Sequence, residues 1–237
     1  MAKAALVTGG AKRIGRTIAL TLASMSYDIA LHYWTSVEEA EATAAEITQR
    51  GVRCSTFKCD LAQEEELLLL LPRVLKEFPE LEILVNNASV FEKAQIAESE
   101  PDFFNRQMAI NFKAPFFLSR DFARNCKKGH IINLLDARIS KNDFNYTVYI
   151  LSKKALAELT KISAREFAPG IRVNAIAPGM ILSPQGKPEK YLEKMALKIP
   201  LKRKGELDNV SESVRFLLNN EFLTGQFIYV DGGENLE

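Results

Sequence analysis

The stretch Ala4-Ala-Leu-Val-Thr8-Gly9-Gly10-Ala11-Lys12-Arg13-Ile14-Gly15 decides the fold that this sequence predicts. A short apolar strand runs through a glycine-rich turn straight into an amphipathic helix. Glycines at such a place let the backbone approach a pyrophosphate, whose charge meets the free N–H groups at the helix start. Many glycine-rich turns are only tight turns, but the position between strand and helix near the N-terminus favours a dinucleotide site. Its expected contacts are Gly9, Lys12, Arg13, Ile14 and Gly15.

Outward from this turn, short apolar runs alternate with longer helical periods along the whole chain. The pattern is typical of an α/β fold, a Rossmann-type doubly wound parallel sheet of about seven strands with helices on both faces. No repeat or low-complexity linker interrupts it, so we predict a single domain over residues 1–237. Strands are predicted near 4–8, 28–33, 52–58, 82–86, 130–135, 171–176 and 226–230. Helices are predicted near 14–25, 37–50, 63–78, 101–125, 148–168 and 207–219.

The largest irregular stretch runs from Pro178 to about Pro200 and is rich in Pro, Lys and Gly. Because it follows a predicted strand directly, and loops at the carboxyl ends of strands line the crevice of such sheets, we predict a substrate lid over about 179–200. The alternative is a surface loop with one short helix.

Composition limits the classes of partner. The chain of 237 residues is 47% hydrophobic and 26% charged, and its net charge of +1 gives no indication of nucleic acid or an anionic membrane. The longest apolar run, Leu67 to Leu71, is far too short to span a bilayer, and no signal-peptide pattern precedes the first strand. Cys54, Cys59 and Cys126 have no metal-ligand spacing, so we expect no metal and reduced thiols in a cytoplasmic protein.

The segment after the second strand bears on the choice of cofactor. An NAD site usually places a carboxylate there to hold the ribose 2′-hydroxyl, but no acid occurs before Glu38. Lys12 and Ser36, and less certainly His32, could instead receive a 2′-phosphate, which favours NADPH. The alternative for His32 is a packing role at the strand end. After the third strand, Asp60 is placed to accept from an adenine amino group or to cap a helix.

Two further features concern chemistry. Tyr149 and Lys153 lie four residues apart at the start of a predicted helix and therefore share one face. A nearby ammonium favours the phenolate and lowers the pKa of the tyrosine toward working pH, as a proton donor requires. Arg13 stands where the usual pattern has its middle glycine. Its planar guanidinium could clamp the pyrophosphate or reach an acceptor on the substrate, the alternative being a solvated side chain.

In this order the motifs resemble the short-chain dehydrogenase/reductase family over essentially the whole chain. The glycine turn is followed by Asp60, Asn86-Asn87-Ala88, Asn111, the Tyr149/Lys153 pair and Pro178-Gly179. The resemblance implies that Asn111 anchors a water chain to Lys153, and that Asn86 and Ala88 line the adenosine and ribose. It implies a loop beside the nicotinamide that begins at Pro178-Gly179, with Ile181 and Ser183 as carboxamide contacts. It also implies a homotetramer built on the two long helices and the last strand.

Within the family, the sequence is most similar to pteridine reductases, including bacterial dihydromonapterin reductases. The shared features are Arg13, Ser89 after Asn-Asn-Ala, the aromatic Phe91, and Asp136 in place of the catalytic serine. This likeness implies that Phe91 stacks on a pterin ring and presses it against the nicotinamide, as flat conjugated rings prefer offset stacking. Thr35 departs from the pattern, which has a basic residue there.

Asp136, thirteen residues before Tyr149, favours one substrate class. Reduction of a ketone builds negative charge on oxygen, which a carboxylate would repel, whereas reduction of a C=N bond passes through a cationic nitrogen that a carboxylate stabilises. We therefore predict NADPH-dependent reduction of a pteridine C=N bond, with Asp136, Tyr149, Lys153 and Asn111 as catalytic residues. Arg13, Ser89, Phe91, Asp136 and Tyr149 are the expected substrate contacts. The alternatives are a 3-oxoacyl-acyl-carrier reductase or other carbonyl reductase, and a dinucleotide-binding protein without turnover.

Overall fold

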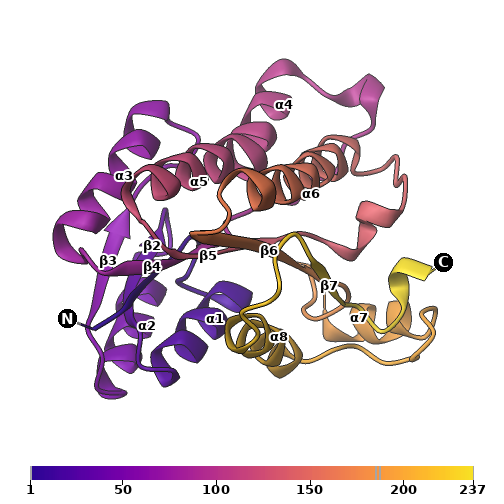
Figure 1. Ribbon diagram of the computed structural model, residues 1–237. Coiled ribbons are helices and arrows are strands. Elements are labelled where there is room, and N and C mark those ends of the chain that lie inside the picture. The colour runs from indigo at the N-terminus through magenta and orange to yellow at the C-terminus, as the bar shows by residue number, and fades with distance from the viewer. Residues whose placement is uncertain (1, 185, 187, 237) are drawn as a thin grey trace.

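A single parallel sheet lies between two layers of helices (Figure 1) in the computed structural model, which describes residues 2–184, 186 and 188–236. The strand order is β3-β2-β1-β4-β5-β6-β7, so the order along the sheet reverses between β1 and β4. A crevice opens at such a reversal, beyond the carboxyl ends of the strands. The strands are β1 (Ala4–Val7), β2 (Asp28–Tyr33), β3 (Cys54–Lys58), β4 (Leu81–Asn86), β5 (Gly129–Leu134), β6 (Ile171–Pro178) and β7 (Phe227–Val230).

The predicted doubly wound α/β class is confirmed, and the helices fall into two layers. The α-helices are α1 (Arg13–Ser24), α2 (Val37–Gln49), α3 (Glu64–Glu77), α4 (Pro101–Met108), α5 (Ala114–Asn125), α6 (Thr147–Glu166), α7 (Glu189–Ala196) and α8 (Leu207–Asn219). Helices α1, α2 and α8 pack on one face of the sheet, whereas α3 and α5 pack on the other. Helix α6 joins α5 on that second face, where it also packs against β6 (Figure 1).

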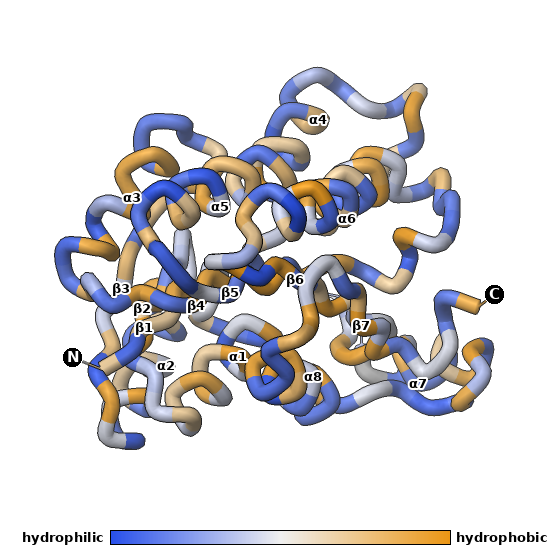
Figure 2. Tube along the Cα trace, viewed as in Figure 1, coloured by the Kyte–Doolittle hydropathy of each residue, from blue (hydrophilic) through white to orange (hydrophobic). Residues whose placement is uncertain are grey.

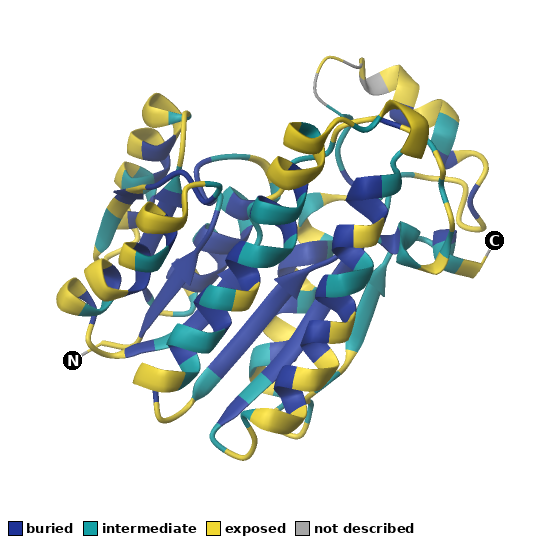
Figure 3. Cartoon of the chain, turned by 90° about the horizontal axis from the view of Figure 1, so that it is seen from above, coloured by how far each residue is buried: buried dark blue, intermediate teal, exposed yellow. Residues whose placement is uncertain are grey.

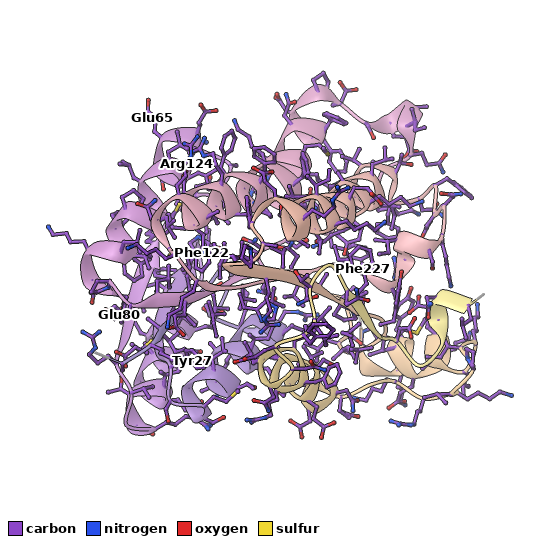
Figure 4. All side chains as sticks on the ribbon, in the orientation of Figure 1. Tyr27, Glu65, Glu80, Phe122, Arg124 and Phe227 are labelled. Atoms are coloured by element: carbon purple, nitrogen blue, oxygen red, sulfur yellow. The ribbon has the colours of Figure 1, made fainter. Side chains whose placement is uncertain are left out.

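The inner strands are mostly apolar and buried because both faces of the sheet are covered there. The edge strands β3 and β7 are only partly buried. In β1, Ala4 and Leu6 belong to the core under α3 and α5, while Ala5 and Val7 belong to the core under α1. Figures 2 and 3 show the result, a hydrophobic and buried sheet with its polar, exposed residues on the outer helix surfaces. Figure 4 shows Phe122, which is fully buried, between α5 and the sheet.

The predicted helix over 101–125 differs from the structure. A π-helical segment, η2 (Ala109–Lys113), separates α4 from α5 within one continuous helical stretch. The segment contains Asn111, whose side chain bonds to the main chain of Val90, so a tertiary contact accompanies the local change in helix type.

The predicted lid over about 179–200 is not entirely irregular, because α7 occupies its second half. Positions 185 and 187 of that stretch lie outside the described residues. Among the residues that the structure describes, no helix is long and apolar enough to cross a membrane. In the same part of the chain, no group of three or more His, Cys, Asp or Glu residues could hold a metal ion.

Candidate active site

The predicted site residues gather at the carboxyl edge of the sheet, where the turn after β1 meets the ends of β4, β5 and β6. The glycine turn is packed tightly. A Cβ on Gly15 would lie 2.1 Å from the carbonyl oxygen of Gly9 and 2.5 Å from Nδ2 of Asn87, and Gly9 itself has a φ of +61°. Lys12, the N-cap of α1, makes no side-chain capping bond, and the first turn contains no acid. The N–H groups of that turn therefore face no competing carboxylate, as an anion site requires.

Thr8 and Asn87 hold this turn against β4. Nδ2 of Asn87 donates to the carbonyl oxygens of Thr8 at 2.8 Å and Gly9 at 3.1 Å. In return, Oγ1 of Thr8 accepts from the N–H groups of Asn87 and Ala88. This positioning role of Thr8 and Asn87 was not predicted from the sequence, although Thr8 lies in the glycine-turn stretch and Asn87 in the Asn86-Asn87-Ala88 motif.

Arg13 has a backbone conformation that favours glycine. Its φ of +55° lies in the left-handed region, which costs a non-glycine residue about 1 kcal/mol or somewhat more. Its exposed guanidinium donates to the carbonyl oxygen of Ser183 at 2.8 Å. The structure thus brings together two predicted site residues that are 170 positions apart in the chain.

Both ring nitrogens of His32 bond to groups within the protein. Its Nδ1 accepts from the N–H of Gly9 at 3.0 Å, which makes Nε2 the protonated nitrogen, 3.0 Å from the carbonyl oxygen of Cys59. Burial lowers the pKa of His32 to about 4, so the ring is neutral at physiological pH. Contrary to the expectation of a 2′-phosphate contact, both ring nitrogens are already bonded. Lys12 remains near the surface, 3.8 Å from Glu39, and half-buried Ser36 precedes α2 without a side-chain capping bond.

Two other predicted cofactor contacts also bond within the chain. Oδ1 of the buried Asp60 accepts from the N–H of Ala62, which closes a local turn before α3 rather than capping that helix. Nδ2 of the buried Asn86 donates to Oδ1 of Asn133 at 2.8 Å, across β4 and β5, and lies 3.3 Å from a serine hydroxyl of α5. The Asn86 side chain therefore bonds within the core through Nδ2, while its Oδ1 has no partner among the described residues. Its contact with the adenosine or ribose stays a prediction.

Asn111 joins three segments of the site. Its Oδ1 accepts from Oγ of Ser89 at 3.0 Å and from the N–H of Val90 at 2.9 Å. Its Nδ2 donates to the carbonyl oxygen of Val90 and to Oγ of Ser152 on α6. The contact with Ser152, which precedes Lys153, was not foreseen in the sequence, and it fixes α6 relative to the loop after β4.

The central pair of the site is Asp136 and Tyr149. The Tyr149 hydroxyl donates to Oδ2 of Asp136 at 2.7 Å, while Oδ1 accepts from the N–H of Arg138 at 2.8 Å. Asp136 is half-buried directly after β5, and Tyr149 is only 5% exposed on α6. Both carboxylate oxygens are thereby held, and the acid points toward the phenol.

The expected effect of Lys153 on Tyr149 is wrong for this structure. Burial, followed by the charge and hydrogen bond of Asp136, raises the pKa of Tyr149 well above its usual 10. The buried Lys153 donates to the carbonyl oxygen of Leu134 at 2.8 Å instead. Burial lowers the pKa of Lys153 to about 8, although Asp136 opposes this shift. Tyr149 is thus a protonated phenol beside a carboxylate, and Lys153 is the group that titrates near neutral pH.

Aromatic rings form one wall beside this pair. Phe91 stacks on Tyr146 with ring centroids 4.4 Å apart and planes 7° from parallel, and Tyr149 meets Phe91 edge-on at 4.7 Å. The guanidinium of Arg138 lies 5.1 Å from the Phe91 centroid and 5.3 Å from that of Tyr146. No role for Tyr146 was predicted from the sequence. Its position one helical turn before Tyr149 was the available signal.

The end of β6 forms the opposite side of the site. Pro178 is the last residue of β6, and Gly179 donates its N–H to the carbonyl oxygen of Val230 at 3.0 Å. A Cβ on Gly179 would lie 2.7 Å from Cβ of Asp231, so only glycine fits there. Ile181 is 2% exposed and packs in the core under α1 and α8, so its side chain anchors the loop after β6 to that core.

A family model described as enoyl-(acyl carrier protein) reductase matches residues 9–235. The chain belongs to the short-chain dehydrogenase/reductase family. Among its relatives in this family, the 3-oxoacyl-[acyl-carrier-protein] reductase FabG of Staphylococcus aureus is 34% identical over 241 residues, with 98% of each chain covered. The family resemblance predicted from the motifs is therefore confirmed.

Two solved structures of the family are similar over nearly the whole chain. FolM alternative dihydrofolate reductase 1 from Brucella suis, in complex with NADP, has a TM-score of 0.94 at 34% identity and covers 99% of this chain and 96% of its own. A blue fluorescent protein from a metagenomic library, in complex with NADPH, has a TM-score of 0.90 at 30% identity, with 98% and 97% covered. FabG and FolM are thus named for different substrates, although both are similar to this chain over nearly its whole length.

Proposed function

We propose that this protein is an NADPH-dependent oxidoreductase that reduces a C=N bond of a dihydropteridine. The observation that carries the proposal is the 2.7 Å hydrogen bond between Tyr149 and Asp136, which directs a carboxylate toward the phenol of the catalytic pair. The similarity to FolM alternative dihydrofolate reductase 1 supports the same substrate class.

The cofactor proposal depends on the turn after β1. NADPH would supply the hydride, and its pyrophosphate would lie over Gly9, Ile14 and Gly15 at the uncapped start of α1. Lys12 and Ser36 are the candidates for the 2′-phosphate, since β2 is followed by no acid before Glu38. The NADP and NADPH complexes of the two similar structures support this choice.

Asp136 decides between carbonyl and imine chemistry. A carboxylate repels the oxyanion that forms during reduction of a ketone, but it stabilises a ring nitrogen that becomes cationic on protonation. A pterin also presents a ring N–H beside an amino group, and two carboxylate oxygens match such a pair. Asp136 therefore orients the ring and favours protonation at nitrogen.

Tyr149 and Lys153 complete the path of the proton. Because its pKa is raised, Tyr149 carries its proton at physiological pH. Its hydrogen bond to Asp136 offers a path by which that proton passes through the carboxylate to the ring nitrogen of the substrate. Lys153, with a pKa lowered to about 8, replenishes that proton in its ammonium form. Asn111 holds α6 against the loop after β4 through Ser152, which positions the pair.

The substrate ring would be bound by the wall beside this pair. Phe91 and Tyr146 offer flat surfaces, and Arg13 and Ser89 offer donors at the mouth of the crevice. Since Tyr146 covers one face of Phe91, a pterin can stack only on the face of Phe91 that remains or displace the Tyr146 ring.

The second candidate is reduction of a 3-oxoacyl thioester, which the identity to the Staphylococcus aureus FabG favours. Steady-state rates of NADPH oxidation with dihydrobiopterin, dihydromonapterin, dihydrofolate and a β-ketoacyl thioester separate the two. We expect turnover of at least one dihydropteridine and little turnover of the thioester. Turnover of the thioester alone would replace the first proposal with the second.

We also propose a homotetramer. A groove of about 640 Å³ runs over α5 and α6, and its lining includes Phe116 and Ile162, which are 42% and 60% exposed. The edge strand β7 is only half-buried along its whole length. Both surfaces are suited to pairing with a second copy, and light scattering of the purified protein measures the assembly.

A further inference from the structure

Lys58 places a cation at the edge of the sheet where the chain leaves β2. It is the last residue of β3 and pairs in register with Tyr33, the last residue of β2, and Figure 1 shows the two strands beside each other. Its Nζ lies 5.5 Å from the ring centroid of Trp34, the residue that directly follows β2. Thr35 and Ser36, which come next, carry no charge. The cation at this corner of the protein is therefore brought by the neighbouring strand.

The ammonium of Lys58 is not neutralised by an acid. Within residues 2–184, 186 and 188–236, its Nζ forms no hydrogen bond and no ion pair, and the residue is exposed. Arg73 donates to the main-chain carbonyl oxygen of Lys58 at 3.2 Å, which leaves the ammonium unbonded. By contrast, Nζ of Lys12 lies 3.8 Å from the carboxylate of Glu39. An aromatic face attracts a cation without cancelling its charge, so Lys58 stays available to an anion.

The adenosine end of a dinucleotide would lie at this corner. In a Rossmann-type sheet, residues after the second strand recognise the 2′ position of the adenosine ribose. Here the N–H of Gly10 donates to the carbonyl oxygen of His32 at 2.9 Å, so the glycine turn lies against the end of β2. The first turn of α2 contains Glu38 and Glu39, which would repel a phosphate. A 2′-phosphate bound here therefore needs a cation, and Lys58 is one that no acid holds among the described residues.

We propose that Lys58 is a specificity-determining residue for the cofactor, whose ammonium binds the 2′-phosphate of NADPH while the ring of Trp34 holds its side chain at the end of β2. Lys58 thereby supplies from β3 the charge that Thr35 lacks. Its role depends on the proposed use of NADPH and is independent of which substrate accepts the hydride.

The first measurement is the Kd of NADPH and of NADH by calorimetry, without substrate. In Lys58→Met, which keeps an unbranched side chain and removes the charge, NADPH binding should weaken roughly tenfold, as expected for one hydrogen bond to a charged group. NADH, which has no 2′-phosphate, should bind as before, and Lys58→Arg, which restores the charge, should recover most of the NADPH affinity. Lys76→Met, at an exposed lysine in the last turn of α3, is the matched control and should change neither Kd. A parallel loss of both cofactors in Lys58→Met, or an unchanged affinity for NADPH, would overturn the assignment of Lys58.

The second measurement uses the fluorescence of Trp34, which is the only tryptophan of the chain and is 37% exposed. Its emission therefore reports on this corner alone. Adenosine 2′,5′-bisphosphate should change the emission of the wild-type protein, and in Lys58→Met the change should require a roughly tenfold higher concentration. Adenosine 5′-phosphate, which lacks the 2′-phosphate, should act at the same concentration in both proteins. Equal shifts for the two nucleotides would count against a contact between Lys58 and the 2′-phosphate.

These binding measurements separate the role of Lys58 from the proposed reaction. Failure of the wild-type protein to turn over any dihydropteridine would reject the proposed substrate and leave the role of Lys58 intact. A preference for NADPH that survives Lys58→Met would reject Lys58 alone. Equal affinity of the wild-type protein for NADPH and NADH would reject both the choice of NADPH and the role of Lys58.

Discussion

Replacement of Asp136 by asparagine tests the chemistry most directly, because it keeps the shape of the side chain and removes its charge. Oδ2 of Asp136 accepts a 2.7 Å hydrogen bond from Tyr149, and the same carboxylate is proposed to stabilise the cationic substrate nitrogen. A hydrogen bond to a charged group contributes about 1.5–3 kcal/mol, which corresponds to a loss of roughly 10- to 150-fold in kcat/KM for a dihydropteridine.

The same change should also move the pH profile. Asp136 raises the pKa of Lys153, which burial has lowered to about 8. Without the carboxylate this pKa falls further, so the ammonium form is lost at lower pH. The alkaline decline in kcat should therefore begin at lower pH in Asp136→Asn than in the wild-type protein.

Initial rates of NADPH oxidation with a dihydropteridine and with a small ketone measure both effects. Asp143→Asn is the matched control, since Asp143 also faces Arg138 but does not contact Tyr149. The pteridine rate should fall while any ketone rate stays constant or rises. Retention of pteridine turnover within about twofold, or a parallel loss of both activities, would refute the reasoning.

Three other predictions follow from particular residues. Burial lowers the pKa of His32 to about 4 and that of His130 to about 3, from 6.5. The unfolded chain binds these protons at a higher pH than the folded chain does. The free energy of unfolding in urea melts should therefore be highest above about pH 6.5 and decline below it by roughly 1.4 kcal/mol per pH unit for each histidine, down to about pH 4. A flat profile would contradict this. Gly15→Ala places a methyl group 2.1 Å from the carbonyl oxygen of Gly9, so NADPH affinity in calorimetry should fall about tenfold or more. Phe116→Glu puts a charge on the groove over α5 and α6 and should reduce the assembly size in light scattering, whereas an unchanged mass would exclude this surface.

The fold was predictable because its signals are local. The predicted strand over 28–33 and helix over 207–219 match β2 and α8, since apolar periodicity and the flanking turn residues lie within each segment. The π segment at Ala109–Lys113 was missed for the opposite reason. It accompanies the bonds between Asn111 and Val90, 21 residues earlier, and no pattern within the helix reports such a contact.

The contact between Asp136 and Tyr149 was predictable from the sequence, but its electrostatics were not. The motif spacing indicated that Asp136 and Tyr149 belong together, yet the raised pKa of Tyr149 depends on burial and on a 2.7 Å contact. His32 was interpreted as a possible phosphate ligand because the sequence around a single histidine does not show which distant groups its ring bonds in the fold.

The hydrogen bond between Arg13 and Ser183 links the turn after β1 to the loop after β6. An exposed hydrogen bond contributes only about 0.5–1.5 kcal/mol, so thermal motion breaks it readily. A molecule that brings its own acceptor would therefore compete for the Arg13 guanidinium at little cost in free energy, and its binding would release the turn after β1 from the loop after β6.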